Sequence, residues 1–233
     1  MALLRGDSGA VRRFLDRIGT IQDHYPSSRC PGSGPPRWSG ATGLPSADGY
    51  RCRVPERPSP DEPAVLVTLC TGNAARSVMA GAMLQGAPLS IVTAGTHVVE
   101  GQPMSRRTRA ALEVLGWKAD GHRSHQVTDG DIDDSALILA MASEHVAYIR
   151  RKHPHAAHRT ASIKRLVRDL PPGSGPLADR LAALRLDEVE LGDWEDVEDP
   201  AGGEDAVYVS CAAELADLCD RLLPRLGDGS TAD

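Results

Sequence analysis

From Pro63 onward the sequence alternates short apolar runs with stretches of helical periodicity, and this alternation constrains the fold more than any other feature. The first run, residues 64–69, is apolar except for one threonine, as expected for a strand that is buried on both faces. Further strands are predicted at residues 89–94, 137–141 and 160–163. Because helical segments separate these runs, the pattern predicts an α/β fold, namely a doubly wound, four-stranded parallel sheet flanked by helices.

The helices are predicted from apolar residues that recur every three or four positions and from the residues that bound them. For one of them, Ser105 is a typical N-cap and Gly116 a typical terminating residue. The predicted helices are residues 77–84, 105–115, 143–152, 177–186 and 206–226.

Residues 1–62 differ from the rest of the chain, because they hold eight of its 17 prolines and several Gly/Ser/Pro runs. This composition predicts a disordered extension, followed by a folded domain at 63–227 and a short tail at 228–233. Within the extension, four apolar residues share one face of a short predicted helix, which we interpret as transient rather than as a docking segment. These residues are Val11, Phe14, Leu15 and Ile18.

The net charge of −6 disfavours a nucleic-acid surface or an anionic membrane as partner, since either requires a basic face. The first residues lack the apolar core of a signal peptide, and no apolar run is long enough to span a membrane. Five cysteines at irregular spacing are typical of free thiols, so a cytoplasmic location is expected. The oligomeric state is left open.

The first predicted strand runs directly into residues 70–77, Cys-Thr-Gly-Asn-Ala-Ala-Arg-Ser, and a predicted helix follows. Ligands of open parallel sheets bind at the carboxyl ends of the strands. A loop there that opens a helix directs several unpaired backbone N–H groups at one point, where the helix dipole adds positive potential. The loop therefore predicts a site for a tetrahedral oxyanion. Its candidate substrate-binding residues are Thr71, Gly72, Asn73, Ala74, Ala75 and Ser77.

Two side chains of this loop supply the chemistry. Cys70 lies where positive potential favours the nucleophilic thiolate, and the Ser77 hydroxyl is placed to donate a hydrogen bond to its sulfur. Arg76 offers a planar fork that matches two oxygens of a phosphate. The alternative is a buried cysteine with an unrelated arginine, but the order of strand, loop and helix favours a nucleophile and its anion clamp.

A phosphate ester also needs a proton donor for its leaving oxygen. Residues 192–200 form an acidic loop in which Asp199 precedes Pro200, so the backbone of Asp199 is held extended. An acidic loop is more often solvated surface. Among its carboxylates, Asp199 is nevertheless the best candidate for the acid.

These residues resemble the low-molecular-weight protein tyrosine phosphatase family, which includes related arsenate reductases. The resemblance covers roughly residues 63–226 and rests on four further segments in the family's order. They are Thr-Ala-Gly-Thr at 93–96, Gly through His at 116–122, Ile-Leu-Ala-Met at 138–141 and Val-Glu-Asp-Pro at 197–200.

The resemblance implies a phosphatase-like catalytic domain that hydrolyses a phosphate monoester, either protein phosphotyrosine or a small phosphoester. In this mechanism Cys70 attacks phosphorus to form a phosphocysteine, and Arg76 and the loop amides hold the oxygens. Asp199 protonates the leaving group and then deprotonates the attacking water. No metal or cofactor is implied. Three histidines near Pro154 are interpreted as a solvated helix end rather than a metal site: His153, His155 and His158.

The chain departs from the family's pattern at several positions. Ala75 stands where many members have a second loop cysteine, so a protective disulfide is not expected. Residues 97–100 and 201–203 lack the aromatic side chains that line the pocket of phosphotyrosine-specific members, which weakens a tyrosine preference. Trp194 is interpreted as a packing residue rather than a replacement.

Two alternatives remain open. An arsenate reductase would need a thiol to resolve the adduct on Cys70. Cys211 and Cys219 share one predicted helix but are interpreted as core residues, so that thiol would be external. The other alternative is a non-catalytic, phosphate-binding regulator.

Overall fold

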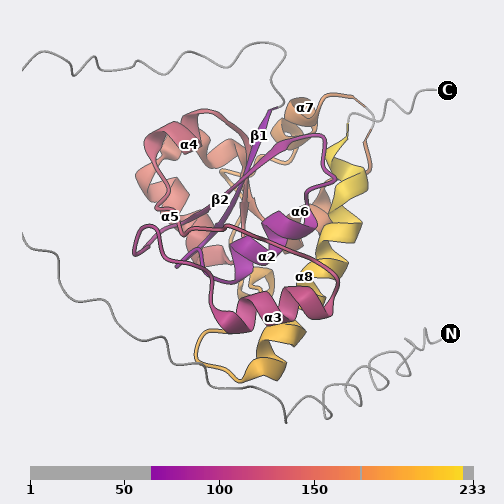
Figure 1. Cartoon of the computed structure of the whole chain (residues 1–233). Helices are drawn as coiled ribbons and strands as arrows, with labels where there is room; N and C mark the ends of the chain where they lie inside the picture. The colour runs from indigo at the N-terminus through magenta and orange to yellow at the C-terminus, as the bar shows by residue number, and fades with distance from the viewer. Residues whose placement is uncertain (1–63, 174, 228–233) are drawn as a thin grey trace, which may run out of the picture. The chain divides into compact units, whose positions relative to one another are not determined.

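The computed structural model describes residues 64–173 and 175–227. The predicted extension at 1–62, its short helix and the tail at 228–233 lie outside these residues. The described part is built on a four-stranded, all-parallel sheet with the strand order β2-β1-β3-β4 (Figure 1). The strands are β1 (Val65–Cys70), β2 (Ser90–Gly95), β3 (Ser135–Ala140) and β4 (Thr160–Ser162).

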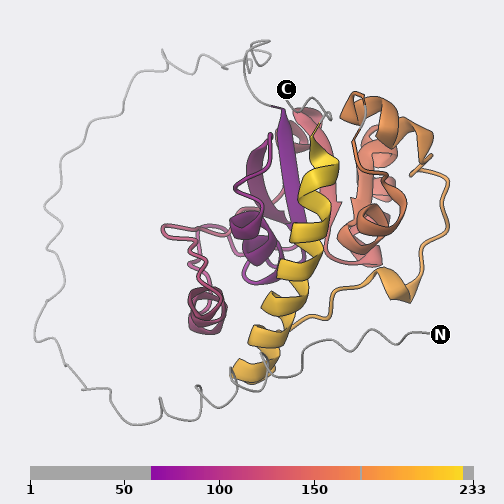
Figure 2. The same ribbon diagram turned by 90° about the vertical axis from the view of Figure 1, so that its right-hand side faces the viewer.

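Helices follow the strands and cover both faces of the sheet (Figure 1), which confirms the predicted fold class. Helix α8 is the longest described helix and packs against α2, α3 and α6 (Figure 2). The helices are α2 (Arg76–Met83), α3 (Arg106–Val114), α4 (Asp129–Asp133), α5 (Ser143–Lys152), α6 (Ile163–Asp169), α7 (Leu177–Ala183) and α8 (Asp205–Leu226), with short 3₁₀ helices η1 (Pro154–Arg159) and η2 (Asp193–Glu195).

Alternate residues of the central strands pack on opposite faces, as a pleated strand requires. In β1, Leu66 and Cys70 join the apolar core under α2 and α8, whereas Val67 and Leu69 join a second core. The second core includes Ile149, from α5. Because both faces are covered, β1 is apolar almost throughout its length.

The segment from 160 to 186 shows where sequence patterns mislead. The strand predicted at 160–163 ends at Ser162, because the Ser162 hydroxyl accepts a hydrogen bond from Arg165 N (3.1 Å) and begins α6, which was not predicted. The helix predicted at 177–186 ends at Ala183, since Arg185 has a left-handed φ of 49°. Helix α4 was also not predicted.

The order of the strands determines where a site can form. Strands β1 and β3 are neighbours, and the connection after β1 leads to β2 on one side whereas the connection after β3 leads to β4 on the other. A crevice forms at such a point, and the loop after β1 lies there. Among the described residues, no helix is both long enough and apolar enough to cross a membrane.

Candidate active site

The loop between β1 and α2 keeps the predicted order of strand, turn and helix. Cys70 is the last residue of β1, and Arg76 is the first residue of α2. Between them, Asn73 adopts a left-handed φ of 47°, a conformation that asparagine tolerates better than most residues. The loop therefore turns at Asn73, and residues on either side of the turn line one cavity with Cys70.

Asn73 is fully buried and braces the loop through both ends of its side chain. Its Oδ1 accepts a hydrogen bond from His125 N (2.9 Å), and its Nδ2 donates one to Ser77 Oγ (3.0 Å). Ser77 Oγ lies 3.0 Å from Cys70 Sγ. Because Asn73 already donates to this hydroxyl, the proton of Ser77 is free to point at the sulfur. The Ser77 hydroxyl is thus placed to donate a hydrogen bond to the sulfur of Cys70.

Gly95, at the end of β2, lets the loop approach the sheet. A Cβ atom at this position would lie 2.6 Å from Thr71 O and 2.9 Å from Asn73 N, both of which are backbone atoms. We expect Gly95→Ala to displace the loop, destabilise the fold by about 1–3 kcal/mol and lower kcat/KM. Urea unfolding and steady-state kinetics measure the two effects. Gly86→Ala, where an added Cβ meets no atom within 4 Å, is a control for added chain stiffness. An unchanged kcat/KM in Gly95→Ala would contradict this account.

Arg76 and Asp199 form one ion pair beside the loop. Arg76 Nη2 donates to Asp199 Oδ2 (2.5 Å), and Arg76 Nη1 donates to Val197 O (3.2 Å). The side chain of Arg76 is 5% exposed and that of Asp199 is 46% exposed. The guanidinium is therefore fixed by the protein, whereas the carboxylate reaches water and can exchange a proton.

Backbone contacts attach the acidic loop to the end of β3 and the start of α5. Val197 N donates to Met141 O (2.9 Å), and Ser143 N donates to Asp196 Oδ1 (2.7 Å). Lys164 Nζ also donates to Asp196 O (2.5 Å). These contacts bring Asp199 to the loop that holds Cys70, although the two are distant in sequence.

A buried ion pair anchors the start of the acidic loop. Glu195 is fully buried and receives two hydrogen bonds from Arg165, at 2.9 and 2.5 Å. Ser162 Oγ (2.8 Å) and Gly192 N (3.1 Å) also donate to Glu195. Burial disfavours the charge, but the hydrogen bonds from Arg165 and Ser162 outweigh it and lower the pKa of Glu195. Sequence reasoning missed this residue.

Trp194 lies against the guanidinium groups of Arg165 and Arg168, 5.1 and 3.9 Å from its ring centre. Its ring is thus used for cation–π contacts within the fold. Trp194 does not line the cavity above Cys70, which agrees with its interpretation as a packing residue.

His145, in the first turn of α5, is a second residue that sequence reasoning missed. It is buried, and its Nε2 lies 3.0 Å from Thr71 Oγ1. Thr71 Oγ1 also lies 3.2 Å from Glu144 Oε1, to which it donates, so His145 Nε2 acts as the donor to Thr71. Burial and the nearby charge of Arg76 lower the pKa of His145 to about 4. The imidazole is therefore neutral. His145 follows β3 at the carboxyl edge of the sheet, and this position is the sequence signal that could have identified it as a site residue.

A cavity of about 110 Å³ opens above the sulfur. Ser105 and Tyr208 also line it, and neither was among the predicted site residues. Tyr208 offers an aromatic side chain from α8 that the segments at 97–100 and 201–203 lack. The lining residues are Cys70, Gly72, Ala74, Ala75, Arg76, Ser105, Asp199, Ala201 and Tyr208.

A second hollow of about 280 Å³ adjoins Arg76 and Asp199. It is lined by four carboxylates and is called the acidic hollow below. The acidic residues are Glu144, Asp196, Glu198 and Asp199.

The two other described cysteines and the histidines near Pro154 have surroundings that indicate a structural role. Cys211 and Cys219 are buried core residues, and burial raises the pKa of each thiol to about 12. Two of the histidines near Pro154 have acidic neighbours: His153 Nδ1 lies 3.3 Å from an Asp129 oxygen, and His155 Nε2 lies 2.9 Å from an Asp133 oxygen. These imidazoles therefore face separate carboxylates.

Comparisons with known proteins agree with this geometry. The family model described as low molecular weight phosphotyrosine protein phosphatase matches residues 65–231. A protein-arginine-phosphatase of Geobacillus stearothermophilus is 31% identical over 167 residues, which cover 70% of this chain and 97% of that protein. The low molecular weight protein-tyrosine-phosphatase YfkJ of Bacillus subtilis is 29% identical over 143 residues, covering 57% of this chain and 77% of YfkJ.

Among solved structures, the YwlE arginine phosphatase from Geobacillus stearothermophilus superposes with a TM-score of 0.57 and 30% sequence identity. The superposition covers 70% of this chain and 93% of that one. The tyrosine phosphatase Wzb from Escherichia coli K30 shares the fold, with a TM-score of 0.56. Because the family model matches well over half of the sequence, the chain belongs to the low molecular weight phosphotyrosine protein phosphatase family.

Proposed function

We propose that this protein is a cysteine-dependent phosphatase that transfers a phosphoryl group from its substrate to Cys70 and then to water. The observation that carries the proposal is the shared cavity of about 110 Å³, which Cys70, Arg76 and Asp199 all line. A nucleophile, an anion clamp and an acid in one cavity meet the needs of phosphoryl transfer without further groups.

The proposed reaction has two displacements at phosphorus. In the first, the Cys70 thiolate forms the S–P bond while the bond to the leaving atom breaks, and Asp199 gives that atom its proton. In the second, Asp199 takes a proton from water, the new O–P bond forms, and the S–P bond breaks to release phosphate. Ser77, 3.0 Å from the sulfur, stabilises the departing thiolate. Loop amides and Arg76 hold the remaining oxygens throughout.

The ion pair between Arg76 and Asp199 couples the clamp to the acid. When Asp199 takes up a proton to become the general acid, it loses the charge that attracts the guanidinium. Arg76 then has a free fork for the phosphoryl oxygens. Binding of a dianionic substrate and protonation of Asp199 therefore favour each other.

The acidic hollow indicates which amino acid of the substrate carries the phosphoryl group. A guanidino group is rich in N–H donors and suits a hollow lined by Glu144, Asp196 and Glu198. Two relatives are named protein-arginine-phosphatase. We therefore propose protein phosphoarginine as a substrate alongside phosphotyrosine, for which Tyr208 offers an aromatic contact.

The test uses the full chain with p-nitrophenyl phosphate, a phosphotyrosine peptide and a phosphoarginine peptide. We expect turnover of the aryl phosphate, and an acid quench should trap phosphate on the peptide that contains Cys70. Glu198→Gln should lower kcat/KM for the phosphoarginine peptide and leave the aryl phosphate unaffected. Labelling at any other residue would overturn the mechanism, and equal effects of Glu198→Gln on all substrates would overturn the role of the hollow.

The alternatives make different demands. An arsenate reductase would need an external thiol, because Cys211 and Cys219 are buried and their pKa values are raised to about 12. A non-catalytic regulator would bind phosphate without trapping it on Cys70. The described cysteines, Cys70, Cys211 and Cys219, are free thiols, which supports the proposal of a cytoplasmic location.

A further inference from the structure

His125 lies next to the phosphate-binding loop but outside the cavity above Cys70. Its backbone N–H donates a hydrogen bond to Asn73 Oδ1 (2.9 Å), and this bond orients the Asn73 side chain. The other end of that side chain donates to Ser77 Oγ, which contacts Cys70. The position of His125 is therefore transmitted to the sulfur through two side chains.

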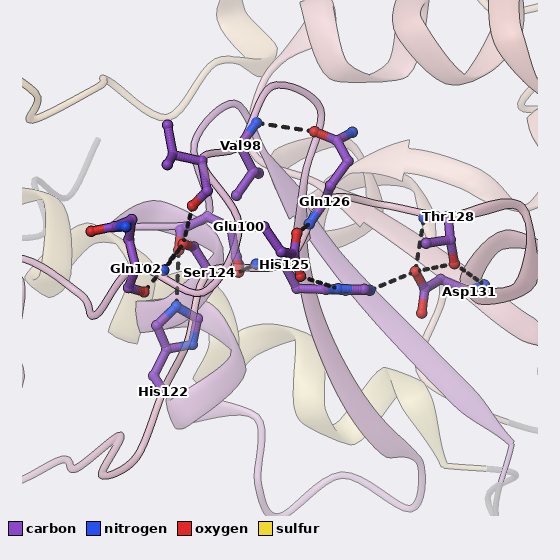
Figure 3. Close-up of polar contacts among 11 residues, drawn as sticks. Val98, Glu100, Gln102, His122, Ser124, His125, Gln126, Thr128 and Asp131 are labelled. Carbon is purple, nitrogen blue, oxygen red and sulfur yellow. Dashed lines mark hydrogen bonds and ion pairs between the residues drawn. The ribbon is translucent and has the colours of Figure 1, made fainter. Parts of the chain in front are cut away.

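The imidazole of His125 lies between two carboxylates that come from different segments (Figure 3). Its Nδ1 is 3.2 Å from Glu100 Oε1, in the loop after β2, and its Nε2 is 2.8 Å from Asp131 Oδ2, in α4. Among the described residues, Glu100 and Asp131 are the titratable groups that face this ring.

Both carboxylates are held by their own surroundings. Glu100 Oε2 accepts a hydrogen bond from Gln126 N (2.7 Å), and Asp131 Oδ2 accepts hydrogen bonds from Thr128 N (2.8 Å) and Thr128 Oγ1 (2.7 Å) (Figure 3). Neither carboxylate can turn away from the ring without losing these bonds. The ring must therefore satisfy two acceptors at once.

Only the doubly protonated imidazole can do so, because a neutral ring has one N–H donor and one bare nitrogen. A bare nitrogen facing a carboxylate oxygen repels it. Resting on the proposed function, we propose that protonated His125 is a positioning residue that joins the loop after β2 to α4 and thereby fixes the amide that orients Asn73. Loss of its proton then loosens the phosphate-binding loop and lowers turnover.

The electrostatics of the ring agree with this geometry. Burial opposes the charge of His125, but the hydrogen bonds to Asp131 and Glu100 outweigh it and raise the pKa above the ordinary value of 6.5. Because the pKa of His125 is raised, the contacts of the protonated ring with Glu100 and Asp131 are complete below pH 6.5. They are lost as the pH rises through the pKa of His125 in the folded protein. The protein is thus predicted to lose activity on the alkaline side.

The first test compares pH profiles of kcat/KM for p-nitrophenyl phosphate in the full chain. The kcat/KM of the wild type should fall about fivefold as the pH rises through the pKa of His125, which is the size of effect expected for a partly exposed ion pair. His125→Arg, which keeps its charge and can donate to both carboxylates, should retain activity across that range. His125→Gln should show the low alkaline activity at every pH. His155→Gln, which removes a similar histidine–aspartate contact outside the site, should match wild type.

An alkaline limb that is unchanged in His125→Arg would overturn the proposal. A second measurement needs no turnover: ¹⁵N NMR of the wild-type chain follows the Asn73 side-chain amide and the His125 ring during a pH titration. We expect both to shift with one midpoint, above pH 6.5. If the Asn73 amide signal does not shift during the titration of His125, the positioning role of His125 is overturned even in an active enzyme. Absence of turnover at every pH would overturn the proposed function instead.

Discussion

Replacing Cys70 with serine is expected to lower kcat/KM for an aryl phosphate by about 10⁴-fold or more, as for the loss of an attacking group in other enzymes. A serine hydroxyl is far less acidic than a thiol, so much less of it is ionised and able to attack phosphorus. Binding of sulfate should survive in this variant, because the loop amides and Arg76 are unchanged.

Kinetics with p-nitrophenyl phosphate and calorimetric titration with sulfate separate the two effects. Cys219→Ser is the matched control, since it alters a buried cysteine that does not line the cavity. Its stability should fall while turnover per folded molecule persists. Substantial turnover in Cys70→Ser would require another nucleophile and would refute the covalent mechanism.

Replacing Glu195 with alanine is expected to destabilise the domain by about 3–5 kcal/mol, because the buried Arg165 guanidinium loses its two hydrogen bonds to Glu195, and the ion pair that it keeps with Asp169 is longer (3.5 Å). Ser162 Oγ and Gly192 N would also lose their acceptor. Since Asp199 follows on the same loop, the remaining folded protein should also have a weakened acid. Chemical unfolding and kcat measured well below the unfolding midpoint report the two consequences.

Glu188→Ala removes an exposed ion pair with Arg185 and should cost no more than about 0.5 kcal/mol. The double variant Arg165→Met/Glu195→Leu should recover much of the lost stability, because it removes both buried charges. The lowered pKa of Glu195 adds a pH signature: its contribution is present above pH 4.5 and disappears as the pH falls through the folded-state value. A Glu195→Ala variant as stable as Glu188→Ala would contradict this role.

The parts of the fold that could be predicted are those with a local signal. The strand that ends at Cys70 and the helix that begins at Arg76 each have a signal in consecutive residues, so the order of strand, loop and helix was predictable. Helix α4 was missed because it is only five residues long and its capping box pairs Thr128 with Asp131 rather than with the usual Glu or Gln. Helix α6 was missed because Ser162 both ends β4 and caps the helix.

The site residues that could not be predicted depend on contacts between distant segments. Asp199 was the best candidate in its acidic loop because it precedes Pro200, and the resemblance strengthened that choice, but only the fold brings it to Arg76. The burial of Glu195 and the neutral state of His145 follow from tertiary packing, which an acidic loop or a helix start does not reveal. Tyr208 reaches the cavity because α8 packs against α2 and α3, a contact without a local sequence signal.

Arg76 and Asp199 are 123 positions apart in the sequence, and this separation has a consequence for biosynthesis. A ribosome delivers the thiol and the guanidinium well before the carboxylate and helix α8. An emerging chain that has completed β1 and α2 would carry the nucleophile without its proton donor. We therefore expect full turnover to begin only once Asp199 has reached Arg76.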